Sequence, residues 1–374
     1  MANIEPLIDV AINIFNSDSP EAPRIHLCVY HSQHPLLIRS SIEQQLDNVL
    51  DRRKPQRVFD ITDIRSRLDS SDEPDHIFIV LGSPVTEVGR DHDYDWAIVE
   101  PSSMRSLIQL AGRVRRHRTE KWEATNIRVF DVNIKHLRSP GDPAFCRPGF
   151  ESEGKWLLNS HHLTELLTSD EVAAIDARPR IMARSPLAPH DSLIDLEHAR
   201  LADLMLLPVE VSSEEVASTN KPTTRRQRMK ADAPKPLPPF RAYSWWSLPH
   251  GTLTGVCPQH QPFRENTTVQ NELVLMPDES GEDYELHQVD TSSRAGPDLL
   301  IPMEKKNHRI AVETLLGAGV EPWGESDYME ALVALAEELD MELEACARKF
   351  GVVTLRESEQ GWRYHPVLGF FQAK

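Results

Sequence analysis

Hydrophobic and polar residues follow two different periods along the first 150 residues. Apolar positions recur at helical spacing over residues 3–15, and residues 36–52 predict a second helix whose charged face carries Arg39 and Glu43. Short, continuous apolar runs typical of buried strands accompany them. These runs occupy residues 25–30, 77–81, 95–99 and 127–132. Strands that alternate with helices favour an α/β domain over residues 1–150, a parallel sheet with helices on both faces.

The pattern becomes helical beyond this domain. Residues 156–168, 169–177 and 190–207 predict helices, and the last carries a stripe of leucine and isoleucine for burial. We expect residues 151–238 to form a helical linker. Residues 212–239 are rich in Ser, Thr, Pro and charge, which predicts a flexible stretch that contains a domain boundary.

Residues 239–374 predict a smaller C-terminal domain of mixed α+β type. Short β-like segments alternate with turns between 240 and 302, and two helices between 326 and 348 precede an aromatic tail. Aromatic side chains can stack on single-stranded bases, but core packing or a protein interface is their commoner use, and we expect it here. The aromatic residues concerned are Trp245, Trp246, Trp362, Tyr364, Phe370 and Phe371.

The charge balance narrows the classes of partner. A formal net charge of −17 argues against a surface that is basic overall, although positive charge gathers at 113–118 and 225–230 and predicts a local basic path. No apolar run approaches the roughly 18 residues of a membrane-spanning helix, and the N-terminus does not resemble a signal peptide. Four isolated cysteines indicate buried thiols. We therefore expect a cytoplasmic protein with no membrane partner.

The segment LIQLAGRVRRHR at 107–118 carries the most specific chemistry. Gln109, Gly112, Arg113 and Arg116 follow the spacing Q-x-x-G-R-x-x-R. We expect the two arginines to lie on one face of a helix, about a turn apart. Guanidinium groups are always charged and offer a planar fork of donors, so such a pair can hold the oxygens of a transferring phosphoryl group. From this segment alone, a solvated basic helix start is an equally good interpretation.

The preceding residues favour the phosphate interpretation. A buried strand at 77–81 leads into a loop with Ser83, Gly89 and Asp91, and a second strand precedes a helix that Ser102 or Ser103 is expected to cap. Ligands of α/β sheets bind at the carboxyl ends of the strands. For Asp93 and Asp95, we expect ordinary loop capping.

Together the two segments resemble motifs V and VI of superfamily 2 helicases, in the form carried by the CRISPR-associated helicase-nuclease of type I systems. LCVYHSQHPLLIRSSIEQQLD at 27–47 is similar to motif IV, and AFCRPGFE at 144–151 and the tail 362–371 narrow the resemblance to type I-F. It implies the C-terminal portion of that enzyme: a second RecA-like domain, a linker and a C-terminal domain.

The resemblance implies roles for individual residues. Arg116 is expected to be the arginine finger and Arg113 a γ-phosphate or coupling contact, with ATP approached also by Gln109, Gly112, Gly89 and Asp91. DNA contacts are expected from Ser83, Thr86, His31 and Arg39. An Arg39–Glu43 helical pair is equally consistent with the spacing in motif IV.

Other segments match catalytic motifs only partly. Gly149–Trp156 fits G-x-x-x-x-G-K, but Trp156 replaces the hydroxyl residue that would bind magnesium. The dipeptides His92-Asp93 and His190-Asp191 lack the further spaced histidines of a nuclease, so we expect no metal bound by this chain. His161-His162 is expected to be structural. A Walker A loop and an acid strand are also missing, so ATP and Mg²⁺ are expected only together with the absent first RecA-like domain.

Two hypotheses follow. In the first, the chain is the C-terminal half of a CRISPR helicase-nuclease that, when complete, uses ATP to translocate on and degrade DNA marked by a crRNA-guided surveillance complex. Alone, it is expected to hydrolyse ATP negligibly. In the second, it is a catalytically inactive module that binds the surveillance complex or an integrase-type CRISPR partner and modulates interference. The expected partners of the first are the N-terminal portion, the surveillance complex and single-stranded DNA. Met1 matches an interior position of the family, which indicates an internal start, a split gene or a truncation.

Overall fold

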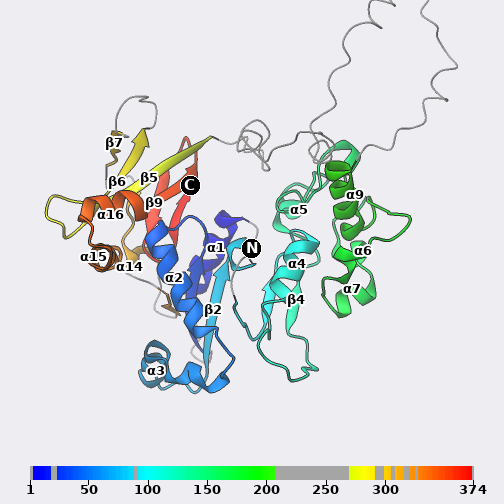
Figure 1. The fold of residues 1–374 in the computed structure, drawn as a ribbon, viewed down its shortest axis with the longest axis horizontal. Helices are drawn as coiled ribbons and strands as arrows, with labels where there is room; N and C mark the ends of the chain where they lie inside the picture. The colour runs from blue at the N-terminus through cyan, green and yellow to red at the C-terminus, as the bar shows by residue number, and fades with distance from the viewer. Residues whose placement is uncertain are drawn as a thin grey trace, which may run out of the picture.

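The computed structural model describes residues 3–17, 23–87, 91–206, 269–290, 299–304, 308–315, 320–324 and 327–372 (Figure 1). Its first sheet has three parallel strands in the order β2-β1-β8. These are β1 (Arg24–Tyr30), β2 (His76–Gly82) and β8 (Val320–Pro322). The strands predicted at 25–30 and 77–81 are confirmed as parallel neighbours, and the third strand comes from the C-terminal region.

The central strand β1 contributes to two cores because its side chains alternate across the sheet. Leu27 and Val29 pack in one core with α1 (Ile4–Phe15), while Cys28 and Tyr30 pack in the other with α2 (Leu36–Val49). The 3-10 helix η1 (Pro55–Asp60) and α3 (Thr62–Asp69) then lead to β2. The α/β fold class with a parallel sheet is therefore confirmed.

The strands expected at 95–99 and 127–132 form a second sheet instead of joining the first. β3 (Ala97–Val99) and β4 (Ile127–Val129) pair with each other in parallel. One face of this pair packs on a separate core around Phe145 and Leu193, and β8 occupies the edge of β1. Burial against the helical region thus separates the two sheets. The other face is exposed, with Ile98 at 58% of its full accessible area.

The helical region is less regular than predicted. The helix expected at 190–207 is confirmed as α9 (Leu193–Met205), and the Ser192 hydroxyl accepts a hydrogen bond from the amide of Asp195 at 3.3 Å. Residues 156–177 form only short helical turns. The remaining helices of this region are α4 (Met104–Ala111), α5 (Ile134–Arg138), η3 (Gly154–Trp156), α6 (Leu163–Leu166), α7 (Ser169–Ala173) and α8 (Arg178–Ile181).

The C-terminal region forms an antiparallel sheet in the order β7-β6-β5-β9. Its strands are β5 (Gln270–Pro277), β6 (Tyr284–Asp290), β7 (Leu299–Pro302) and β9 (Val352–Arg356). The two predicted helices are confirmed as α15 (Tyr328–Leu339) and α16 (Leu343–Phe350), with α14 (Val312–Leu315) before them. The chain ends in the hairpin β10 (Trp362–His365) and β11 (Gly369–Gln372).

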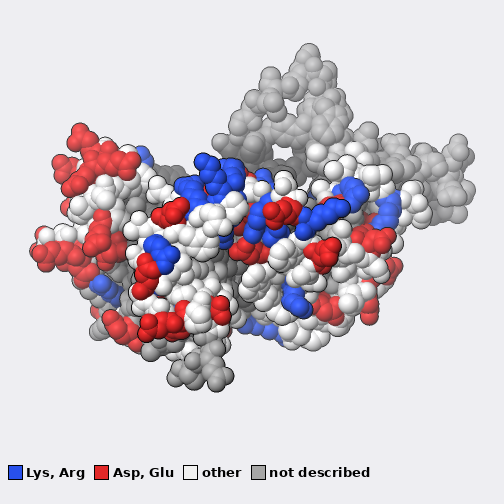
Figure 2. Space-filling view, turned by 90° about the horizontal axis from the view of Figure 1, so that it is seen from below, with Lys and Arg blue, Asp and Glu red and all other residues white. Residues whose placement is uncertain are grey.

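Charged side chains are unevenly distributed over one face of the molecule. Figure 2 shows Lys and Arg side chains gathered across the middle of this face, whereas Asp and Glu crowd its left end, where Figure 1 places α15 and α16. The expectation of basic surface on an acidic body agrees with this view. Within the described segments, no helix is long and apolar enough to cross a membrane.

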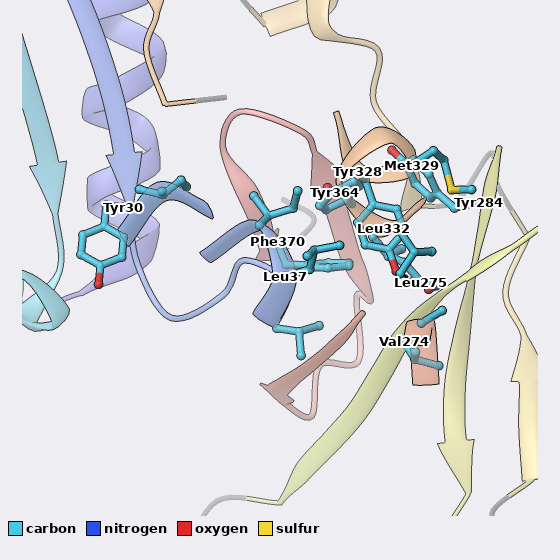
Figure 3. Packing of buried hydrophobic residues seen from close by; sticks show 14 of the residues in the cluster. Tyr30, Leu37, Val274, Leu275, Tyr284, Tyr328, Met329, Leu332, Tyr364 and Phe370 are labelled. Carbon is cyan, nitrogen blue, oxygen red and sulfur yellow. Dashed lines mark hydrogen bonds between the residues drawn. The ribbon is translucent and has the colours of Figure 1, made fainter. Parts of the chain in front are cut away.

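The largest core joins the two ends of the chain. Tyr30 and Leu37 belong to one cluster with Leu275, Tyr328 and Phe370 (Figure 3). Trp362, Tyr364 and Phe370 are buried, as expected for core aromatics, and Phe371 packs at the edge of the core around α1. Trp245 and Trp246, and the boundary predicted within 212–239, lie outside the described residues. Residues assigned to the first and third predicted units therefore share a single core.

Candidate functional site

The helix that carries Gln109 is fixed at both ends. Ser103 is its N-cap and accepts a hydrogen bond from the amide of Ser106 at 3.1 Å, as one of the two predicted caps. The helix ends at Ala111 with Gly112 as its C-cap. Arg113 and Arg116 therefore lie beyond the helix, and the expectation that they share a helix face is wrong. Gly112 itself keeps a right-handed backbone, with φ of −69°, and its amide still donates to the carbonyl of Ile108 at 3.0 Å.

The loop after α4 turns back towards the preceding motif. Arg115 has a left-handed backbone, with φ of 53°, and Val114 forms a β-bridge with Tyr94. The amide of Tyr94 donates to the carbonyl of Arg113 at 2.8 Å, and the amide of Arg115 donates to the carbonyl of Tyr94 at 2.9 Å. These bonds place the arginines beside Asp91, Asp93 and Asp95.

Asp93 is the buried centre of this loop pair. Its side chain is fully buried and accepts hydrogen bonds from the amides of Arg116 and His117, each at 3.1 Å. It also accepts from Nε and Nη2 of Arg118, at 3.1 and 2.6 Å. Asp95 pairs with Arg118 and, at 3.2 Å, with Arg52. Both aspartates stabilise the loop, which agrees with the capping role expected for them.

Asp91 and Arg116 form an ion pair at the surface of the same loop. Nε of Arg116 donates to the Asp91 carboxylate, and Nη1 donates to the carbonyl of Gly112 at 3.2 Å. The hydrogen bond from Arg116, followed by the His117 ring whose Nε2 lies 3.3 Å from the carboxylate, lowers the pKa of Asp91 to about 2. The Arg116 side chain remains 41% exposed. Its guanidinium is thus held in place yet open to solvent.

Arg113 lies deeper than Arg116. Nη2 of Arg113 donates to the carbonyl of Glu87 at 3.4 Å, and its buried Nε has no hydrogen-bond partner among the described residues. Burial, followed by the charge of Arg116, lowers the pKa of Arg113. A water or a ligand oxygen can satisfy such a buried donor. Gln109 and Gly112 are exposed at the end of the same helix, whereas Gly89 lies outside the described residues.

Ser83 and Thr86 lie at the carboxyl ends of β1 and β2. The amide of Ser83 donates to the carbonyl of Tyr30 at 3.1 Å, and the Thr86 hydroxyl donates to the carbonyl of Ser83 at 3.0 Å, within η2 (Pro84–Glu87). Ser83 is only 5% exposed. The two residues therefore shape the turn after β2, and of the two Thr86 is the more accessible.

The structure argues against the DNA contact expected of His31. Its ring is fully buried, with Nε2 2.8 Å from the carbonyl of Leu368, while Nδ1 accepts from the amide of Gln33 at 3.1 Å. Burial lowers the pKa of His31 to about 4. The ring instead anchors the C-terminal hairpin, whose Phe370 amide donates to the carbonyl of Gln33 at 2.9 Å.

Arg39 stays partly exposed, and its Nε lies 3.8 Å from the carboxylate of Glu43, the alternative pair that the spacing allowed.

The Gly149–Trp156 segment is organised by Glu151, whose carboxylate accepts hydrogen bonds from the amides of Ala144, Phe145 and Leu158 at 2.7–3.1 Å. The carboxylate fills this loop and also lies 2.8 Å from His161 Nε2. The structural role expected of His161 agrees with this geometry.

Sequence reasoning missed the basic segment 52–57, which reads RRKPQR. The amide of Arg52 donates to Nδ1 of His117 at 3.2 Å, and Arg53 shares the Asp91 carboxylate with Arg116. The run of charge was visible in the sequence, but its place beside residues 113–118 depends on a contact between distant segments. No group of three His, Cys, Asp or Glu side chains in the described ranges is arranged to hold a metal ion.

Comparisons with known proteins find similar sequences for two parts of the chain. Residues 1–119 match the family model described as CRISPR-associated nuclease/helicase Cas3, C-terminal. Residues 275–372 match the model of the CRISPR-associated Cas3 subtype I-F/YPEST-like C-terminal domain. The chain matches the C-terminal portion of the type I-F Cas3 family. The first match contains the segments that resemble motifs IV, V and VI, and the second contains most of the antiparallel sheet and the hairpin that anchors on His31.

Two relatives cover nearly the whole chain. The CRISPR-associated nuclease/helicase Cas3 subtype I-F/YPEST of Pseudomonas aeruginosa (strain UCBPP-PA14) is 43% identical over 99% of this chain. That of Pectobacterium atrosepticum (strain SCRI 1043) is 38% identical over 100% of it. The chain spans 31% of the length of each relative and matches the C-terminal portion of the family.

Proposed function

We propose that this chain supplies the arginine-bearing half of an ATP-driven DNA motor within a CRISPR helicase-nuclease. The observation that carries the proposal is the convergence of Asp91, Arg113 and Arg116 at the end of α4. Planar, permanently charged guanidinium groups suit the oxygens of a transferring phosphoryl group. The names of the two relatives, nuclease/helicases, support the same reaction class.

In this proposal, Arg116 is the arginine finger and Arg113 a second phosphate contact. The exposure of Arg116 lets its guanidinium leave Asp91 for a stronger anion, and the unpartnered Nε of Arg113 leaves a donor for a phosphate oxygen. Gln109 and Gly112 border the same place, and Gly89 belongs to it by resemblance alone. ATP with Mg²⁺, held chiefly by the first RecA-like domain, supplies the phosphoryl group whose hydrolysis drives translocation.

The remaining contacts belong to the DNA and to protein partners. Ser83, Thr86 and Arg39 are proposed DNA contacts, and His31 positions the hairpin. The complete enzyme is recruited by a crRNA-guided surveillance complex, works with an integrase-type partner and acts on single-stranded DNA in the cytoplasm. Phosphate contacts of this kind position a strand without reading its sequence.

The test is DNA-stimulated ATP hydrolysis by this chain alone and mixed with a separately prepared N-terminal portion. We expect negligible turnover alone and clear turnover in the mixture. Arg116→Ala lowers the rate of the mixture by about 10³–10⁵, the usual contribution of an arginine finger. Arg116→Lys keeps the charge but not the planar fork and rescues little. Arg65→Ala is the matched control, because Arg65 is an exposed arginine paired with an aspartate on α3.

Full activity of the Arg116→Ala mixture would contradict the assignment. A folded chain that gives no active mixture but binds the surveillance complex tightly would support the second hypothesis, a non-catalytic module that modulates interference. Turnover by this chain alone, in a preparation free of contaminating ATPases, would refute the division of the motor between two parts.

A further inference from the structure

We infer that a second surface of this chain binds the phosphates and bases of single-stranded DNA next to the arginine loop. This surface, the basic platform, consists of Arg53, Lys54, Arg57, Arg115, Trp96 and Trp122. This inference rests on the proposed function and deepens it, because it names where the DNA strand binds. Of the platform residues, only Arg115 belongs to a segment that resembles a helicase motif. Its members come from three distant segments that the fold brings together.

The charge of these segments opposes the charge of the chain. Residues 51–57, 91–95 and 113–122 hold nine Lys and Arg and five Asp and Glu, in a chain with a net charge of −17. Contacts join the three segments: Arg53 shares Asp91 with Arg116, and the Arg52 amide donates to His117. A local excess of positive charge on an acidic body is the electrostatic footprint of a polyanion site.

The cations on this platform remain available to a ligand. The side chains of Arg53 and Arg57 are 61% and 48% exposed. Among the described residues, no carboxylate lies within salt-bridge distance of Lys54 or Arg115. Exposed ion pairs such as that of Arg57 with Asp51 contribute little to stability. The arginine of such a pair can therefore exchange its carboxylate partner for a phosphate.

Two exposed tryptophans lie in or directly beside these segments of the chain. Trp122 is 56% exposed, and the guanidinium of Arg115 lies 4.3 Å from the centre of its ring. Trp96 is 53% exposed and follows Asp95, which pairs with Arg52 and Arg118. Tryptophan is usually much more buried than this. Aromatic rings beside a basic groove are the arrangement that binds single strands, because every base offers a face to stack on.

The tryptophans distinguish a single strand from other polyanions. A duplex hides its base faces, and a nucleoside triphosphate has one base, so neither needs two exposed rings beside a row of cations. RNA and DNA single strands share the stacking chemistry. The proposed function, an ATP-driven DNA motor, favours DNA over RNA as the strand.

Fluorescence anisotropy of a labelled oligothymidylate, titrated with the full chain without ATP, tests the inference. Trp122→Ala is expected to weaken binding about fivefold to a hundredfold, the range for the loss of one stacked base, and Trp122→Phe to restore most of it. Lys54→Ala is expected to reduce the slope of log affinity against log salt by about 0.7, the value for one lost phosphate contact on a single strand. Lys155→Ala, which removes an exposed lysine elsewhere, is the control and leaves both quantities unchanged.

Wild-type affinity of Trp122→Ala, with wild-type folding by circular dichroism, would overturn the inference. Tighter binding of oligouridylate would assign the platform to RNA and refute the DNA assignment. Displacement of the oligonucleotide by tripolyphosphate, with no effect of Trp122→Ala, would assign the cations to the nucleotide. Because ATP is absent, failure here is distinct from failure of the motor, which Arg116→Ala tests.

Discussion

Asp93 offers the strictest test of how the arginine loop is held. The fully buried carboxylate accepts two backbone amides, those of Arg116 and His117, and two guanidinium donors of Arg118. A hydrogen bond to a charged group contributes about 1.5–3 kcal/mol, and removing one partner of a buried ion pair costs about 3–5 kcal/mol. Without Asp93, Arg118 still forms its ion pair with Asp95, and its side chain is 15% exposed to water, so part of the loss is offset. We therefore expect Asp93→Ala to lower the free energy of unfolding by about 3 kcal/mol.

Two measurements check this value. Urea unfolding at neutral pH gives the global loss, and Asp93→Asn, which keeps one acceptor oxygen, should lose less. Hydrogen exchange of the Arg116 and His117 amides should quicken by about a hundredfold, the factor that corresponds to 3 kcal/mol. Asp69→Ala removes an exposed carboxylate paired with Arg65 and should leave the unfolding midpoint unchanged. If Asp93→Ala destabilises no more than this control, the loop is held by other contacts.

Two further predictions concern the hairpin on His31. Gly369→Ala should lower the free energy of unfolding by about 1–3 kcal/mol, because φ of Gly369 is +70° and the added Cβ would lie 2.9 Å from His31 Cε1 and 3.1 Å from the carbonyl oxygen of Gln33. Urea unfolding measures the loss. Gly361→Ala is the control and should cost less, because φ of Gly361 is +74° but no atom lies within 4 Å of its Cβ position. Burial lowers the pKa of His31 to about 4, so between pH 6.5 and pH 4 the unfolded chain binds more protons than the folded chain. The free energy of unfolding should therefore fall by about 3 kcal/mol as the pH is lowered through that window. His31→Asn should flatten the dependence of the urea midpoint on pH.

Local patterns predicted the elements whose causes are local. The apolar runs located β1 and β2, Ser103 marked the start of α4, and Ser192 precedes α9. Gly112 was also informative, because a glycine that follows an apolar run often marks the end of a helix. The sequence could therefore have predicted that the helix ends before Arg113.

Elements fixed by distant partners could not be predicted in this way. β8 has three residues and no periodicity, and it is a strand only because it bonds to β1, almost 300 residues earlier. His31 follows a strand, where a ligand contact is the usual expectation, yet its Nε2 is hydrogen-bonded to the carbonyl of Leu368. The identity of a side chain can suggest its chemistry, but only the fold decides whether a ligand or the protein itself uses it.

The helix α2 links the two segments of this chain that match Cas3 family models. The carbonyl of Leu50, at its end, accepts the amide of Asp93, whose carboxylate holds the backbone of the arginine loop. Along its length, Leu46 and Val49 pack in the core that also contains Leu355 and residues of α15. Since the same helix contacts both, the C-terminal sheet and the loop that carries Arg116 have a common support. The C-terminal sheet therefore reaches the loop of the proposed finger through one helix, α2, whose packing it shares.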